Sequence, residues 1–177
     1  MITNDSFLEI LSSTGRSTEI SAEDDLYGWL IGSWDLDLKL HDDAGVVHDS
    51  RGEAHFSWVL EGRAIQDIFI NPRRSERGPA LAKLESNWFG STLRMYDPSH
   101  RNWRITWLNP ITGSSADLIG RRSGEDIVQQ GKFSDGGVIR WTFHDIATDS
   151  FRWLGERWDG DAEMWRTQVE FRGWRVS

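Results

Sequence analysis

Cysteine is absent from this chain of 177 residues, which also contains only 4 prolines and 3 methionines. Without cysteine the protein forms no disulfides, no zinc–thiolate sites and no thiol nucleophile. No stretch reaches the length of a membrane-spanning helix, and residues 1–21 lack the basic start and apolar run of a secretory signal. We therefore expect a cytoplasmic protein whose chemistry does not depend on thiols.

Basic residues are also in short supply, because 20 Lys and Arg face 28 Asp and Glu, for a formal net charge of −8 at pH 7. An acidic surface repels phosphate backbones and anionic lipids, so we expect no nucleic acid and no membrane as partner. Hydrophobic residues at 38% and charged residues at 27% are typical of one soluble globular domain. We divide the chain into an N-terminal extension, residues 1–21, and a single domain, residues 22–177.

Tryptophan, in contrast, is abundant, with 11 residues. Most lie in segments where apolar and polar residues alternate, as from Trp34 to His41, where Trp34 and the leucines share one side of a strand. Short spacers rich in Asp, Gly, Pro and Ser separate these segments, so consecutive strands are expected to pair antiparallel. The pattern predicts an all-β fold of about ten strands, either a sandwich or, as we favour, an up-and-down β-barrel.

One helical signal precedes the strands. Ser21 and Asp24 resemble a capping box, and Leu26 and Leu30 lie one helical turn apart. We therefore expect a short N-terminal helix over residues 22–31, which closes one end of the barrel.

Gly32-Ser33-Trp34 opens the first predicted strand directly after this helix. The tripeptide resembles the Gly-x-Trp signature of the calycin superfamily, which includes the lipocalins and the fatty-acid-binding proteins. The wider pattern, roughly residues 28–172 with Leu60–Arg63 as one turn, is similar to bacterial lipocalin-like proteins of unknown function. The resemblance implies a barrel in which Trp34 closes the floor beneath a C-terminal arginine, either Arg172 or Arg175.

The segment Asn71–Ser86 interrupts the alternation and is too long for a hairpin turn. It carries the basic residues Arg73, Arg74, Arg77 and Lys83. Long ordered loops in compact domains often act as lids over a site. A solvated surface loop is the alternative, and both interpretations stay open at this stage.

The turns also indicate which side chains share a face, because a shift of one residue moves every side chain of a strand to the other face. A five-residue turn at residues 97–101 places Phe89, Leu93 and Met95 inside the barrel with Trp103, Ile105 and Trp107. The same turn leaves Arg94 opposite Arg104 on the outer face. Such a pair is unfavourable unless an anion lies between the two side chains.

A three-residue turn at residues 159–161 determines the face assignment of the last two strands. It places Trp153 and Trp165 inside, and it sets Arg157 beside Glu163 near one rim. In the preceding pair of strands, His144 and Asp126 fall on the outer face, where a solvated pair is expected rather than a haem ligand.

Polar residues on the predicted inner face are the candidates for function. Asp67 is the foremost, because an inward carboxylate among aromatic rings would orient a ligand or transfer a proton. Alternatively, Asp67 forms a structural salt bridge with Arg63 or accepts a bond from a buried indole. The predicted ligand-binding residues are Trp58, Asp67, Phe69, Trp107, Gln129, Trp141, Trp153, Arg157 and Trp165.

Three functions fit such a barrel. The first is binding of a small apolar or aromatic molecule between the tryptophans. The second is a cofactor-independent isomerase, cyclase or lyase reaction with Asp67 as general acid/base. The third is a completely filled barrel that serves as an interaction or dimerisation module, and outward tryptophans at Trp88, Trp158 and Trp174 would favour a homodimer.

Histidine gives no indication of a metal site. His48 and His55 lie an odd number of positions apart on one predicted strand and so face opposite sides. Glu53 shares a side with His55, but two ligands without a third do not make a site. We predict no metal and no cofactor.

Overall fold

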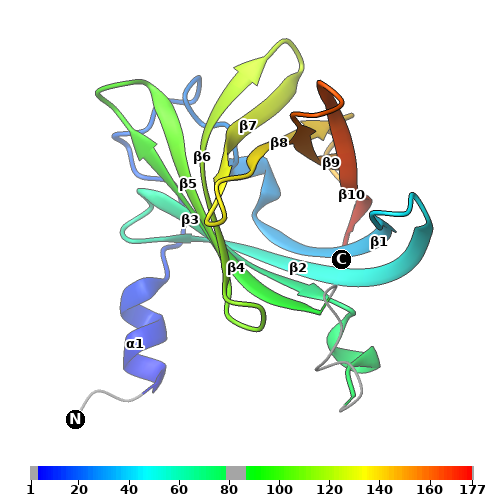
Figure 1. Ribbon diagram of the computed structural model, residues 1–177. Helices are drawn as coiled ribbons and strands as arrows, with labels where there is room; N and C mark the ends of the chain where they lie inside the picture. Colours follow the sequence, from blue (N-terminus) through cyan, green and yellow to red (C-terminus); the bar gives the residue numbers. More distant parts are fainter. Residues whose placement is uncertain (1–3, 79–86, 177) are drawn as a thin grey trace.

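The computed structural model describes residues 4–78 and 87–176, which form a closed barrel (Figure 1). A helix, α1 (Asn4–Leu11), and a 3-10 turn, η1 (Gly28–Leu30), precede the strands, and a second 3-10 turn, η2 (Arg74–Glu76), follows β3. The ten strands of the described part are β1 (Gly32–His41), β2 (Val47–Val59), β3 (Ala64–Asn71), β4 (Trp88–Asp97), β5 (Asn102–Asn109), β6 (Ser114–Ser123), β7 (Asp126–Phe133), β8 (Val138–His144), β9 (Ser150–Asp159) and β10 (Met164–Arg175). No helix in these ranges is long and apolar enough to span a membrane.

Each strand pairs antiparallel with the next one along the chain, and β1 pairs with β10 to close the sheet. This arrangement confirms the predicted all-β up-and-down barrel over the sandwich. The alternation in β1 is realised as expected, since Trp34, Leu36 and Leu38 are buried while Asp35 and Asp37 between them are exposed. Closure leaves no unpaired sheet edge, so each side chain of a strand faces either the interior or the solvent.

The helix predicted over residues 22–31 is wrong in extent, because only the short turn η1 forms there. The start of the segment is as expected, since the Ser21 hydroxyl accepts a hydrogen bond from the Asp24 N–H at 3.1 Å. The carboxylate of the next residue, Asp25, accepts a hydrogen bond from the Gly28 N–H at 2.7 Å. A side chain that binds a nearby backbone N–H competes with helix formation, and Gly28 is a weak helix former.

Residues of the predicted N-terminal extension lie against the barrel. Ser12, just after α1, pairs with Val59 at the end of β2, and the Ser17 N–H donates to the Gly62 carbonyl at 2.9 Å. Ile20 is buried in the core. Ile20 therefore adds apolar cover at the closed end of the barrel, whereas Phe7, Leu8 and Ile10 of α1 are exposed.

Arg175 holds the floor of the barrel together. Its guanidinium lies 4.2 Å from the ring centroid of Trp34 and donates to the carbonyls of Trp29 at 2.6 Å, Ile31 at 2.7 Å and Thr148 at 2.7 Å. The C-terminal arginine implied by the lipocalin resemblance is therefore Arg175. The contact joins both ends of the barrel sequence, because β1 follows η1 directly and Arg175 ends β10.

The first part of the long loop is anchored to the sheet. The Glu53 carboxylate on β2 accepts hydrogen bonds from the Arg74 N–H at 2.7 Å and from Arg74 Nε at 2.9 Å. Arg77 donates to the carbonyls of Asn71 at 3.2 Å and Trp88 at 3.2 Å. Residues 79–86, with Lys83, lie outside the described residues, so a lid role for this loop stays a prediction.

The floor contact gives the first testable prediction. Replacing Arg175 by Ala removes three hydrogen bonds to carbonyls and the contact with Trp34. We expect the free energy of unfolding, measured by urea denaturation, to fall by about 2–4 kcal/mol. The control is Arg172→Ala, which removes an exposed arginine of the same strand and should change stability by less than about 0.5 kcal/mol. Equal losses in the two variants would contradict this role of Arg175.

The loop anchor predicts a pH dependence. Hydrogen bonds from Arg74 lower the pKa of Glu53 from its ordinary 4.5 to about 2. A carboxyl with a lowered native pKa stabilises the fold above its unfolded pKa, and this contribution is lost as the pH falls from 4.5 towards 2. Glu53→Gln should therefore be less stable than the wild type near neutral pH, and the difference should shrink at about pH 3. Urea denaturation at both pH values, with the exposed Glu23→Gln as control, tests this; a constant difference would contradict it.

Candidate functional site

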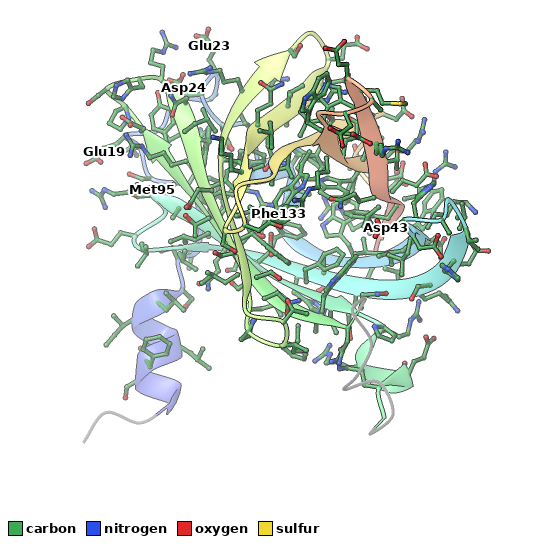
Figure 2. The ribbon with its side chains drawn as sticks, in the orientation of Figure 1. Glu19, Glu23, Asp24, Asp43, Met95 and Phe133 are labelled. Carbon is green, nitrogen blue, oxygen red and sulfur yellow. The ribbon has the colours of Figure 1, made fainter. Side chains whose placement is uncertain are left out.

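The barrel encloses a cavity of about 1290 Å³ that opens at the end formed by the β1–β2, β5–β6 and β7–β8 turns. The other end is filled, because Tyr27, Leu30 and Trp34 pack there without exposure to solvent. Phe133 lines the cavity and Asp43 lies in the β1–β2 turn at its open end; both are labelled in Figure 2. The described residues leave the interior open, so the alternative of a completely filled barrel is wrong.

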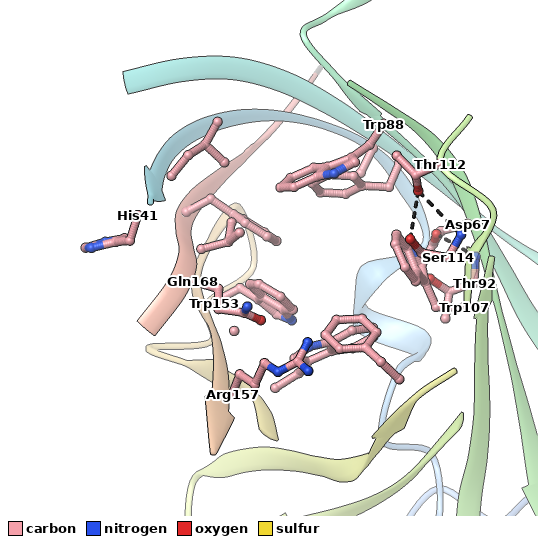
Figure 3. A pocket seen from close by; sticks show the side chains of 18 of the residues that line it. His41, Asp67, Trp88, Thr92, Trp107, Thr112, Ser114, Trp153, Arg157 and Gln168 are labelled. Carbon is pink, nitrogen blue, oxygen red and sulfur yellow. Dashed lines mark hydrogen bonds between the residues drawn. The ribbon is translucent and has the colours of Figure 1, made fainter. Parts of the chain in front are cut away.

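Aromatic side chains on alternate strand positions form the walls of the cavity (Figure 3). The rings of Trp153 and Phe171 stack with centroids 4.7 Å apart and an interplanar angle of 14°. Trp141 lies 5.6 Å from Trp153 and 6.1 Å from Trp107, the latter at an angle of 90°. These rings give the cavity apolar aromatic walls, which suit an apolar or aromatic ligand.

A salt bridge lies at the inner wall of this cavity. Arg94 Nη1 on β4 donates to Asp67 Oδ2 on β3, and the Thr92 N–H donates to Asp67 Oδ1 at 3.1 Å. The two charged side chains are only 5% and 3% exposed, respectively. The guanidinium also lies 5.3 Å from the ring centroid of Tyr27 and 5.5 Å from that of Phe56. Both charges are thus balanced and hydrogen-bonded, as buried ions require.

The inward position of Arg94 corrects the predicted register of β4. Asp97 pairs with Asn102, so the turn contains four residues rather than five, and β4 presents its other face to the interior. Arg94 therefore does not oppose Arg104, which is exposed and pairs with Met95. The side chains predicted inside on this strand, Phe89, Leu93 and Met95, face outward instead.

The partner of Asp67 also differs from the one considered in the sequence. Arg63 lies on the surface and donates to Glu19 at 2.9 Å and to Glu61 at 2.5 Å. The salt bridge to Asp67 comes instead from Arg94, on the neighbouring strand. The sequence contained one indication of this pair, since Arg94 interrupts the alternation of β4. The predicted five-residue turn placed Arg94 on the outer face, so the sequence did not identify it as the partner of Asp67.

Several buried polar atoms near this pair have no hydrogen-bond partner among the described residues. They are Arg94 Nε, the Tyr27 hydroxyl and both amide atoms of Gln129, which is fully buried. The Tyr27 hydroxyl lies against Gly120, where an added Cβ would approach it to 2.1 Å, and Gly120 pairs with Gln129. Burial raises the pKa of this hydroxyl, so Tyr27 stays protonated.

Six of the predicted site residues line the cavity, and their role in binding stays a prediction: Asp67, Phe69, Trp107, Trp141, Trp153 and Arg157. Trp58 and Gln129 point inward but are buried in the core and contribute no wall to the cavity. Two further lining residues, Arg94 and Trp88, were predicted on the outer face. Both belong to β4, so the one-residue register error explains both.

Trp165 was predicted inside and lies outside. A β-bulge in β10 leaves Gln168 without a partner between the pairs Thr167–Glu156 and Val169–Gly155. The β9–β10 turn also contains four residues, 160–163, rather than the predicted three, because Asp159 pairs with Met164. The turn and the bulge together put Trp165 on the outer face and keep Val169 and Phe171 inside. Trp165 consequently lies on the outer surface, where the Arg140 guanidinium covers its ring at 4.3 Å.

The rim of the cavity is charged and mostly acidic. Arg157 Nη1 donates to Asp135 Oδ2 at 3.0 Å, rather than meeting Glu163 as predicted. His48 Nε2 lies 3.1 Å from Asp42 Oδ2. Hydrogen bonds lower the pKa of both rim carboxyls, chiefly from His48 for Asp42 and from the Gly137 N–H for Asp135, so both stay ionised at neutral pH.

The remaining histidines do not form a metal centre in the part of the chain that the structure describes. No three His, Asp or Glu side chains in these ranges are arranged to hold an ion. His144 Nδ1 lies 2.9 Å from Asp126 Oδ2 on the outer side of the barrel, as expected for a surface pair.

The barrel is similar to solved structures of low sequence identity. The S-type phycobiliprotein lyase CPES from Guillardia theta aligns with a TM-score of 0.59 and 11% identity over 89% of this chain and 94% of that chain. Rv2717c from M. tuberculosis aligns with a TM-score of 0.57 and 10% identity over 89% and 99% of the two chains. No family model and no curated protein matches the sequence. These similarities show a shared lipocalin-like barrel fold.

The buried salt bridge yields a stability prediction. Asp67→Asn leaves the Arg94 guanidinium without its counter-charge, and we expect the free energy of unfolding to fall by about 3–5 kcal/mol. The double variant Asp67→Leu/Arg94→Met removes both charges and should recover most of that loss. Asp117→Asn, on the outer face, should stay close to the wild type. Urea denaturation measures all three; an Asp67→Asn protein as stable as the wild type would refute the pairing.

Proposed function

We propose that this protein binds a small apolar or aromatic molecule inside the barrel. The observation that carries the proposal is the open cavity of about 1290 Å³ with tryptophan and phenylalanine walls. Ligand pockets commonly measure about 300–1,000 Å³, so a molecule of several fused rings fits this space. Burial of its rings against Trp107, Trp141 and Trp153 supplies the affinity, at about 25 cal/mol per Å² of apolar surface.

Binding fits the position of Asp67 better than catalysis does. A general base gains a proton during the reaction, which for Asp67 would remove the counter-charge of the buried Arg94 guanidinium. Asp67 Oδ2 already accepts from Arg94, and Oδ1 accepts from the Thr92 N–H. We therefore assign Asp67 the role of positioning Arg94 rather than that of the acid/base of an isomerase, cyclase or lyase.

The barrel fold agrees with this proposal without identifying the ligand. One protein of similar fold is described as a phycobiliprotein lyase, but at 11% identity the similarity extends to the fold alone. We take the class of ligand from the cavity itself. Homodimerisation through the outward Trp158 and Trp174, which are 39% and 44% exposed, stays a separate prediction.

The proposal is tested by filling the cavity. Ala54 lines it from β2, and Ala54→Phe places a ring in the ligand space. With a panel of naphthalene derivatives, neutral and anionic, we expect tryptophan fluorescence quenching by the wild type and an affinity at least about tenfold lower in the variant. Ala147→Phe, in the exposed β8–β9 turn at the closed end, should bind as the wild type does. If no compound quenches the wild type, or if Ala54→Phe binds equally well, the proposal fails.

A further inference from the structure

We propose that the ligand is an uncharged aromatic molecule that presents a carbonyl-type oxygen to Arg94 at the inner wall of the cavity. The inference rests on the proposed function and narrows its ligand class. It follows from three features of the cavity: a donor without a partner, a charge pair that is already balanced, and a rim dominated by carboxylates.

The donor is the guanidinium of Arg94. Arg94 lines the cavity, its side chain is 5% exposed, and its Nη1 is taken by Asp67. A guanidinium carries five N–H donors, and the described residues take one of them, at Nη1, while the buried Nε has no partner among them. A buried N–H of a charged group that gains an acceptor contributes more than a neutral hydrogen bond does, so an oxygen on the ligand has a strong partner here.

The charge of the ligand follows from the balance at this wall. Asp67 already neutralises Arg94, so a ligand carboxylate would be a second negative charge against one buried positive charge. Removing such an unbalanced charge from water costs far more than removing a neutral carbonyl. A neutral acceptor obtains the hydrogen bond without this penalty.

The charges around the cavity also favour a neutral ligand over an anionic one. Four carboxylates but only two guanidiniums line the cavity among the described residues: Asp42, Asp43, Asp67 and Asp135 against Arg94 and Arg157. At the rim itself Arg157 is already paired with Asp135. An anion therefore meets a negative potential on entry, whereas a neutral aromatic molecule does not.

The test compares three probes that share one ring system: naphthyl methyl ketone, naphthoate and ethylnaphthalene. The ketone offers an uncharged acceptor, naphthoate a charged one, and ethylnaphthalene none. For the wild-type protein we expect the ketone to bind about tenfold tighter than either of the other two, by calorimetric and fluorescence titration. If naphthoate binds as tightly as the ketone, or tighter, the inference is overturned while ligand binding stands.

Equal affinity for the ketone and ethylnaphthalene would also overturn the inference, since no polar group would then be recognised. Absence of binding by all three probes would overturn the proposed function as well. The three affinities of the wild-type protein therefore test the inference by themselves, even if a variant does not fold.

Two variants test the roles of the residues. Asp67→Asn leaves Arg94 unbalanced and should shift the preference at least about tenfold towards naphthoate. Asp67→Leu/Arg94→Met removes the donor without leaving a charge, so the ketone and ethylnaphthalene should bind equally. Asp117→Asn is the matched control, because its carboxylate lies on the outer face and accepts the Thr106 hydroxyl at 2.8 Å; it should keep the wild-type selectivity.

Discussion

In a closed barrel every strand residue faces either the interior or the solvent, and a shift of one position exchanges the two. This constraint determines which side chains meet in the cavity. The turn between β4 and β5 sets the face of Arg94, and the bulge at Gln168 sets the face of Trp165. The cavity and its polar wall are thus products of two local backbone features rather than of composition.

The interior is divided into a filled end and an open end. At the filled end the aromatic floor and Arg175 join the start of β1 to the end of β10. Towards the open end, inward side chains such as Trp107, Trp141 and Trp153 do not fill the interior, and a cavity remains between them. A buried ion pair is weak evidence for stability, because its desolvation offsets much of its attraction. The Asp67–Arg94 pair is better explained by what it presents to the cavity.

The sequence was sufficient for the architecture. Strict alternation, as in β1, and short turns between strands predict a meander that must close, and the comparison with solved barrels agrees. The contact of Trp34 with a C-terminal arginine followed from the lipocalin resemblance. Only the turn η1 forms before β1, because the Asp25 side chain binds the Gly28 N–H in competition with a continuous helix over residues 22–31.

The candidate site was only partly predictable. Asp67, Phe69 and Trp141 lie on strands whose turns were counted correctly. Arg94 and Trp88 did not emerge because Asp97 pairs with Asn102, and sequence pattern does not distinguish a four-residue turn from a five-residue turn. Trp165 was misplaced because the β9–β10 turn has four residues rather than three and because a bulge inserts a residue at Gln168 without any signal such as glycine. The volume of the cavity depends on how rings pack, which alternation does not specify.

The most direct test of the account is a crystal structure of the protein soaked with naphthyl methyl ketone. The account predicts electron density for the ring system between Trp107, Trp141 and Trp153, with the ketone oxygen within hydrogen-bond distance of Arg94. An interior filled by side chains, or an Arg94 side chain that points to solvent, would contradict it.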